Sequence, residues 1–387
     1  MTKTSGQDSE DSGDTAAPIP AFSVQARERA KRALRRAKAQ DRCHLAELPV
    51  DAEHFGFLTD DRFWYSDQRG CWMVPTLIEA IRNQHLLTQS SGTLNCVLWG
   101  TPWDGWLVSG SVAWRCLDGA GLTPVNIAAA GLPRGMCGSP PFHLVAAGAD
   151  WFATGSVFGG EVRVVRSPPP ATARGLLDVL CQRDLSRPWA VAVVGQLGDS
   201  STRLLATGNG QRFAVISAGG SHLIGDQISV RVDPDGHPES GALHPDGDLL
   251  AVCSRSLTLV GVNGTHFTIP TPLRRAAAFS KDGRYLVFCT DGDGMAGQGD
   301  LVAWDLLADD ARIIGNTQYG GHQTRIEFSS SGRRLGVTGT QLRVFSWTRI
   351  VAVWGDLPRS AAQIPLRTRT RPIDAPPEHV TVGGSHR

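Results

Sequence analysis

The stretch that decides the fold reads GGHQTRIEFSSSGRRLGVTGTQLRVFSW, from Gly320 to Trp347. Short runs with alternating apolar residues lie on either side of turn-forming residues, first Ser330–Gly332 and then Gly339-Thr340. Period-two runs separated by glycine-bearing turns are typical of an antiparallel β-meander, because a tight turn needs a positive φ or a local side-chain cap. The stretch therefore predicts three consecutive strands, the last of which ends on Trp347.

The same pattern recurs along the body of the chain. Seven short apolar runs, each preceded by a turn and each expected to be the second strand of its repeat, open at Arg62, Gly105, Asp150, Arg203, Asp248, Arg284 and Arg333. The openings are separated by 43, 45, 53, 45, 36 and 49 residues, and four-stranded propeller blades repeat about every 40–50 residues. This spacing predicts an all-β body over residues 44–358, built as a seven-bladed β-propeller of four-stranded antiparallel blades.

Two dipeptides give the repeat a family resemblance. Trp304-Asp305 closes a predicted strand, and Gly321-His322 stands at the entrance of the last repeat, whose third strand ends on Trp347. This order resembles a blade of the WD-repeat family, in a degenerate, bacterial-type form. The resemblance implies that His322 hydrogen-bonds within its blade and that the other signature residues are structural. Each dipeptide occurs once at its family position, and the first four repeats match less well than the last three.

The segments that flank the body differ from it in composition. Residues 1–21 form an acidic segment rich in Ser, Gly, Asp and Pro, and residues 359–387 a basic, proline-rich tail; both are predicted to be disordered. Residues 22–43 are mostly helix formers, which predicts a helix. Between Arg27 and Arg42 eight basic and two acidic residues give a net charge of +6. The candidate partner contacts on this helix are Arg27, Arg29, Lys31, Arg32, Arg35, Arg36 and Lys38.

The basic helix has two interpretations. It is either a solvated lead into the domain or a docking arm for an acidic partner, for nucleic acid or for an anionic membrane surface. The whole chain carries a net charge of only +1, so the body between the flanks is mildly acidic. Any association with nucleic acid is therefore expected in the flanks. Between Arg27 and Arg42, Leu34 is the one large apolar residue, which argues against insertion of this stretch into a bilayer.

Four local expectations complete the secondary structure. The spacing of apolar residues predicts helices within Thr76–Gln89 and Ala171–Leu185. One more strand is expected over Ile350–Trp354. Because an open edge strand promotes aggregation, His44–Val50 or a nearby N-terminal segment is expected to complete the last blade beside that strand.

The eight cysteines are widely spaced and form no C-x-x-C motif. Several fall inside predicted strands, where small buried residues are common. We interpret them as reduced and structural, which indicates a cytoplasmic protein. No apolar run is long enough to span a membrane, and the first residues lack the apolar core of a signal peptide.

The sequence contains few signs of catalysis. It has no G-x-S-x-G elbow, no phosphate-binding loop and no H-E-x-x-H motif, so no catalytic residue, cofactor or metal is predicted. Asp291 and Asp293, with the later Asp300, resemble the start of a calcium loop but lack its closing Glu. The leading hypothesis is a non-enzymatic scaffold that binds a protein or peptide on one propeller face. The alternatives are a lactonase- or lyase-like hydrolase with a metal or carboxylate site in the central channel, and nucleic-acid association through the basic helix.

Overall fold

The computed structural model describes strands and their connections along most of the body of the chain. The described residues are 31, 34–35, 38–52, 54–77, 84–89, 96–101, 104–109, 112–117, 121–126, 144–155, 162–172, 174–176, 191–194, 205–208, 212–217, 220–224, 229–232, 238, 240–254, 256–262, 266–269, 273–290, 298–318 and 324–360. Gly321, His322, Asp291, Asp293 and the basic residues Arg27, Arg29, Arg32 and Arg36 lie outside these ranges. So do residues 1–21 and 361–387, so the disorder expected for the two ends of the chain stays a prediction there. At the start of the expected tail, Arg359 forms a β-bridge with Arg312 and the Ser360 N–H donates to the Ala311 carbonyl.

The described residues form seven four-stranded antiparallel sheets. The first three sheets contain β2 (His54–Phe57), β3 (Phe63–Asp67), β4 (Gly70–Val74) and β5 (His85–Gln89); β6 (Cys96–Thr101), β7 (Asp104–Ser109), β8 (Val112–Leu117) and β9 (Gly121–Asn126); and β10 (Leu144–Ala147), β11 (Trp151–Gly155), β12 (Val162–Arg166) and β13 (Val191–Val194). The fourth contains β14 (Leu205–Gly208), β15 (Phe213–Ser217), β16 (Gly220–Ile224) and β17 (Ser229–Val232).

The remaining sheets contain the best-matched repeats. The fifth and sixth consist of β18 (Ser240–Leu243), β19 (Leu249–Cys253), β20 (Leu257–Gly261) and β21 (His266–Ile269), and of β22 (Leu273–Phe279), β23 (Tyr285–Thr290), β24 (Gln298–Asp305) and β25 (Asp310–Gln318). The seventh has β26 (Ile326–Phe328), β27 (Arg334–Val337), β28 (Leu342–Ser346) and, from the start of the body, β1 (His44–Leu48). The prediction of an all-β body of four-stranded antiparallel sheets is confirmed.

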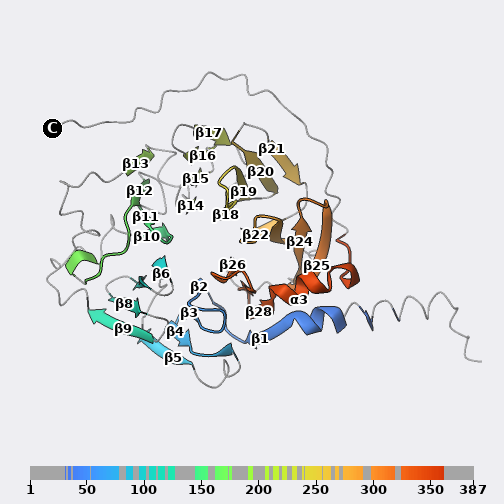
Figure 1. Cartoon of the computed structure of the whole chain (residues 1–387), viewed down its shortest axis with the longest axis horizontal. Coiled ribbons are helices and arrows are strands. Elements are labelled where there is room, and N and C mark those ends of the chain that lie inside the picture. The colour runs from blue at the N-terminus through green and yellow to red at the C-terminus, as the bar shows by residue number, and fades with distance from the viewer. Residues whose placement is uncertain are drawn as a thin grey trace, which may run out of the picture.

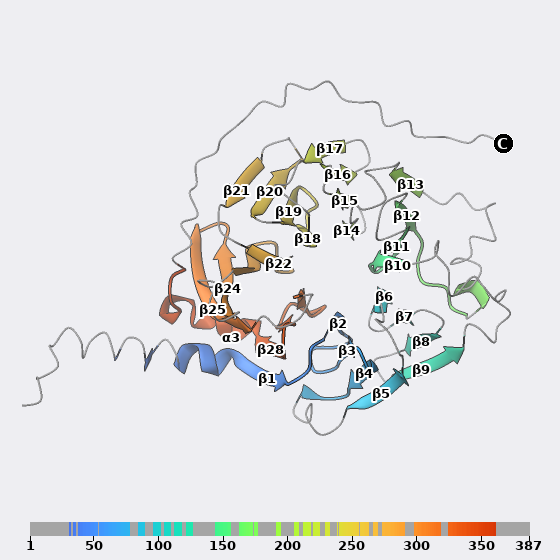
Figure 2. The same ribbon diagram turned by 180° about the vertical axis from the view of Figure 1, so that it is seen from behind.

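The sheets follow one another around a common centre in chain order (Figures 1 and 2). The first strand of each sheet lies nearest the centre and contacts the first strand of the next, and β26 contacts β2 in the same way. The apolar core lies between neighbouring sheets. One cluster, for example, packs Ala251 and Leu259 of the fifth sheet against Phe288 and Trp304 of the sixth.

Three turns show how the sequence builds these sheets locally. In the turns that join the first and second strands of the fifth, sixth and seventh sheets, Gly247, Gly283 and Gly332 have φ of 74°, 70° and 73°. That left-handed conformation costs glycine little and other residues more. In each turn the glycine N–H donates to the carbonyl three residues earlier. The glycine at this place in three of the repeats thus meets a backbone requirement.

The expected closing strand is partly confirmed and partly wrong. Residues His44–Leu48 do complete the last sheet, but they pair with β28. Residues 350–354 are not a strand: α3 (Trp347–Ala352) is followed by the 3-10 helix η3 (Trp354–Asp356). The physical reason is that β1 already occupies the edge beside β28, while buried Trp347 and Ile350 are three residues apart, on one face of a helix.

Two further expectations need correction. The run from Arg203 was expected to supply the second strand of its sheet, but Leu205–Gly208 is the first strand and Phe213–Ser217 the second. Both are apolar strands, so their composition alone did not fix the register. The helix expected within Thr76–Gln89 does not extend to its end, because His85–Gln89 is strand β5. Within Ala171–Leu185 the described residues 174–176 are helical.

Candidate protein-interaction surface

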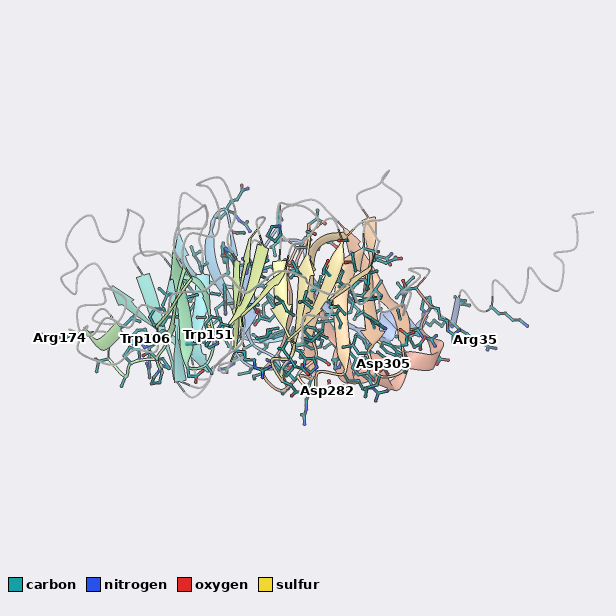
Figure 3. All side chains as sticks on the ribbon, turned by 90° about the horizontal axis from the view of Figure 1, so that it is seen from above. Arg35, Trp106, Trp151, Arg174, Asp282 and Asp305 are labelled. Carbon is teal, nitrogen blue, oxygen red and sulfur yellow. The ribbon has the colours of Figure 1, made fainter. Side chains whose placement is uncertain are left out.

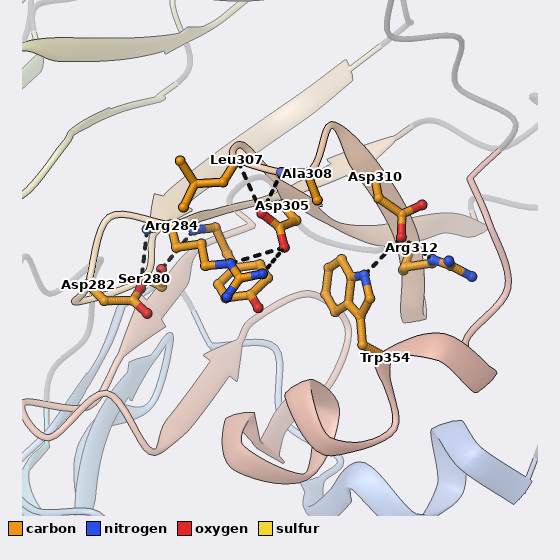
Figure 4. A network of polar contacts seen from close by, with 10 residues as sticks. Ser280, Asp282, Arg284, Asp305, Leu307, Ala308, Asp310, Arg312 and Trp354 are labelled. Carbon is orange, nitrogen blue, oxygen red and sulfur yellow. Dashed lines mark hydrogen bonds and ion pairs between the residues drawn. The ribbon is translucent and has the colours of Figure 1, made fainter.

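Trp304 and Asp305 end strand β24 and organise the turn that follows. The Trp304 indole N–H donates to Asp309 Oδ1 at 3.1 Å. Asp305 Oδ1 accepts the backbone N–H groups of Leu307 and Ala308, both at 3.0 Å. Its Oδ2 accepts two bonds from the Arg284 guanidinium, at 3.0 Å and 2.6 Å (Figure 4). The Trp-Asp pair therefore has a structural part in this turn.

The electrostatics of Asp305 follow from these contacts. Burial acts to raise its pKa, but the hydrogen bonds from Arg284 and from the two backbone N–H groups outweigh burial, and the pKa lies below its usual value. The carboxylate is therefore ionised at neutral pH and its lone pairs are occupied. This geometry stabilises a turn and leaves no free base for proton transfer.

A second buried aspartate has the same kind of environment. Asp67, at the end of β3, accepts the backbone N–H groups of Arg69 and Gly70 at 2.9 and 3.1 Å. The Arg69 side chain and the Trp72 indole N–H also donate to it. Sequence reasoning missed Asp67; the signal was the spacing of Asp67 and Gly70 across a two-residue turn, which is typical of an Asp that caps the N–H groups after it.

We call the surface made by residues 58–62, 244–248, 280–284, 305–309 and 329–333 the turn face. Asp282 and Asp305 lie at the same edge of the molecule (Figure 3). Three connections on this surface are the glycine turns described above. It includes Leu307, which is 82% exposed, and the exposed residues Lys281 and Asp246.

Hydrogen bonds join neighbouring sheets across the turn face. Arg212, at the start of β15, donates to the Gly247 carbonyl at 2.9 Å. His244 Nε2 lies 3.0 Å from the Gly283 carbonyl. Since His244 Nδ1 accepts the Asp246 N–H, Nε2 carries the proton that bonds to Gly283. The side chain of Ser331 donates to Asp60, across the boundary between the last and first sheets.

These links fix the relative positions of the exposed turns. Arg334 also pairs with Asp61 at 3.3 Å across that last boundary. A surface whose turns are tied to one another loses little conformational entropy when a partner binds. The turn face is thus a surface of mixed charge whose turns are held in fixed relative positions, and it carries one exposed leucine.

The helix before β1 joins the outer edge of the sixth and seventh sheets. Ala39 and Cys43 are buried in a core cluster with Trp347 and Ile350. Gln40 Nε2 donates to the Ile313 carbonyl at 3.1 Å, and Arg349 donates to the Arg42 carbonyl at 3.2 Å. Of the seven predicted contact residues, Lys31, Arg35 and Lys38 are described, and all three are exposed.

The described residues contain no group of three or more His, Cys, Asp or Glu side chains that could hold a metal ion. No described helix has the length and apolar character needed to cross a membrane. Asp300, a candidate member of the calcium loop considered above, lies in β24. Its backbone N–H donates a hydrogen bond to Thr290 Oγ1 at 3.2 Å.

The comparisons with known proteins give structural likeness only. No family model matches the chain, and no curated protein matches its sequence. The WD40 domain of Neurospora crassa Pan2 is similar with a TM-score of 0.48 and 9% identity, over 78% of this chain and 94% of that chain. The β-propeller domain of Myceliophteria thermophila Cps50 (Swd1) is similar with a TM-score of 0.47 and 13% identity, over 77% and 96%.

Proposed function

We propose that the chain is a seven-bladed, WD-repeat-like β-propeller that acts as a non-enzymatic scaffold for protein–protein interaction. The observation that carries this proposal is the turn face, on which exposed loops from neighbouring sheets are tied to one another. Rigid frames that present loops are well suited to recognition. The partner is a protein or peptide that binds across one face of the ring.

The cytoplasm is the compartment that we propose for this protein. Cys43, Cys71, Cys253 and Cys289 are buried, and burial raises the pKa of the Cys43 thiol. Buried thiols with raised pKa values are inert structural residues, as expected in a reducing compartment.

The experiment compares two variants of the full chain in quantitative affinity purification from the native host. Asp246→Lys with Leu307→Glu changes two exposed positions of the turn face, while Thr348→Glu changes an exposed position of α3 on the outer edge. A partner that binds the turn face is expected to be lost from the first variant and retained by the second. Equal melting temperatures of the two variants would show that the loss is not caused by unfolding. Equal recovery of every companion protein by both variants and the wild type contradicts binding at the turn face.

The enzymatic alternative, a lactonase- or lyase-like hydrolase with a metal or carboxylate site in the central channel, remains a prediction from the sequence. The exposed basic helix is the observation that favours the nucleic-acid alternative. Binding of a nucleic acid through this helix would fall steeply with salt, because phosphate contacts release counterions. Deleting residues 1–43 abolishes such binding if the helix is its source, and retained salt-sensitive binding contradicts it.

A further inference from the structure

Four basic residues form a row along the helix that precedes β1. Lys31, Arg35, Lys38 and Arg42 are separated by four, three and four residues, so they lie on one face of the helix. All four side chains are exposed. At about 1.5 Å of rise per residue, the row is roughly 17 Å long. We call these four residues the basic row.

The basic row is held in place at its C-terminal end. Ala39 and Cys43 lie on a different face of the helix and are buried against the ring, which leaves the basic row directed toward solvent. Arg349, from α3, adds a fifth cation beside the end of the row, because its guanidinium donates to the Arg42 carbonyl. Arg35 lies at the outer edge of the molecule (Figure 3).

Within the described part of the chain, Arg35, Lys38 and Arg42 form no ion pair with an acidic side chain. Like charges three and four residues apart on a helix destabilise it. An anionic segment laid along the basic row would remove that repulsion. The described residues therefore present a linear cationic surface that an anionic chain can complement.

The sequence contains a matching anionic segment close by. Asp8, Glu10, Asp11 and Asp14 lie within seven residues, and only 16 residues separate Asp14 from Lys31. If residues 22–30 continue the helix, as the sequence predicts, the segment must run back along about 14 Å of helix to reach Lys31. Residues 15–21 can span up to about 24 Å, which is enough for this return. A connection this short gives the segment a high effective concentration at the row, so a weak contact suffices.

We propose that the acidic segment, residues 8–14, lies on the basic row of the same chain. It neutralises the row and covers it against other polyanions. A nucleic acid or an acidic protein must then displace the segment before it reaches these residues. The inference is independent of what binds the turn face, so its failure leaves the proposed scaffold function untouched.

Zero-length cross-linking of the full chain by a carbodiimide tests the contact directly, because it joins only carboxylates and amines that touch. Mass spectrometry is expected to find links from residues 8–14 to Lys31 and Lys38 in the monomer. They disappear in about 1 M NaCl, where charges are screened beyond roughly 3 Å. Lys281, exposed on the ring, is the control amine. No links to the basic row, or links to Lys281 in equal yield, overturn the proposal.

A charge cycle on heparin resin separates contact from net charge. The tail variant carries Asp8→Asn, Glu10→Gln, Asp11→Asn and Asp14→Asn. The row variant carries Lys31→Gln, Arg35→Gln, Lys38→Gln and Arg42→Gln, with folding checked by circular dichroism. Tail neutralisation is expected to raise the eluting NaCl concentration clearly in the wild-type background and by less than half as much in the row variant. Equal shifts in both backgrounds, or no shift in either, overturn the proposal.

Discussion

Glu327 is a titratable residue whose surroundings could not be read from its own repeat. It lies on β26, nearest the centre of the ring, and accepts a hydrogen bond from the Phe57 backbone N–H of the first sheet. Burial raises its pKa to about 7, against the opposing effects of Lys281, this hydrogen bond and Arg325. The residue keeps partial solvent exposure, so the energetic consequence is smaller than full burial would give.

The raised pKa of Glu327 predicts a pH-dependent stability. A carboxyl whose folded-state pKa exceeds its unfolded value of 4.5 favours folding at low pH, and this contribution is lost as pH rises from about 4.5 to 7. Glu327→Gln keeps an acceptor for the Phe57 N–H but cannot ionise. In urea unfolding at pH 8 the variant is expected to be more stable by on the order of 2 kcal/mol, and by much less at pH 5. Parallel pH profiles of wild type and variant contradict this environment for Glu327.

Asp305 gives the opposite dependence, because its pKa is lowered in the folded protein. Its stabilising contribution is present above the unfolded pKa and is lost as pH falls through the folded one. Asp305→Asn removes the charge that Arg284 and two N–H groups bond, and is expected to cost about 2 kcal/mol at pH 7. The control is Asp246→Asn, whose side chain is 81% exposed. Urea midpoints that shift equally for both variants would refute the role of Asp305.

At the scale of single elements, strand β1 is the one whose absence has the largest predicted effect. It supplies the outer strand of the seventh sheet, and Leu48 is fully buried against Leu342 and Val344. A chain that begins at Asp51 leaves the edge of β28 unpaired, and such edges aggregate. Size-exclusion chromatography is expected to show aggregates for this truncation and a monomer-like peak for a chain that begins at Lys31. A soluble, fully folded chain from Asp51 would show that β1 is dispensable.

The elements that the sequence predicted well are those with local signals. β19 and β23 follow Asp-Gly turns and are short, almost continuous apolar runs, so both could be located from a few residues. The second strand of the fourth sheet was placed too early, because Leu205–Gly208 and Phe213–Ser217 are both apolar strands. Helix α3 was missed because whether residues 347–352 continue a sheet depends on β1, which is remote in the sequence. The site residues Asp67 and Glu327 depend on turn geometry and on a contact with another sheet.

At the scale of the whole molecule, the boundary between the last and first sheets tests the ring. Gly336 of β27 faces Phe55 of β2, and a Cβ at Gly336 would lie 2.1 Å from the Phe55 ring. Gly336→Ala is expected to destabilise the protein by about 1–3 kcal/mol through overpacking. Gly355→Ala is the control, since nothing lies within 4 Å of its Cβ position.

A second substitution makes this prediction specific to the boundary. Phe55→Leu shortens the side chain that Gly336→Ala meets, so the two changes together should cost less than the sum of their separate effects. Thermal or urea unfolding of the four proteins gives this coupling. Strict additivity would indicate that β27 and β2 do not pack together.

The central claim is that seven four-stranded sheets surround one centre, with the start and end of the body sharing the last sheet. An experimental structure of the full chain, by crystallography or electron cryo-microscopy, tests it most directly. The account predicts seven sheets, with residues 44–48 paired to residues 342–346 and β26 beside β2. A different number of sheets, or a first strand that pairs elsewhere, would contradict it.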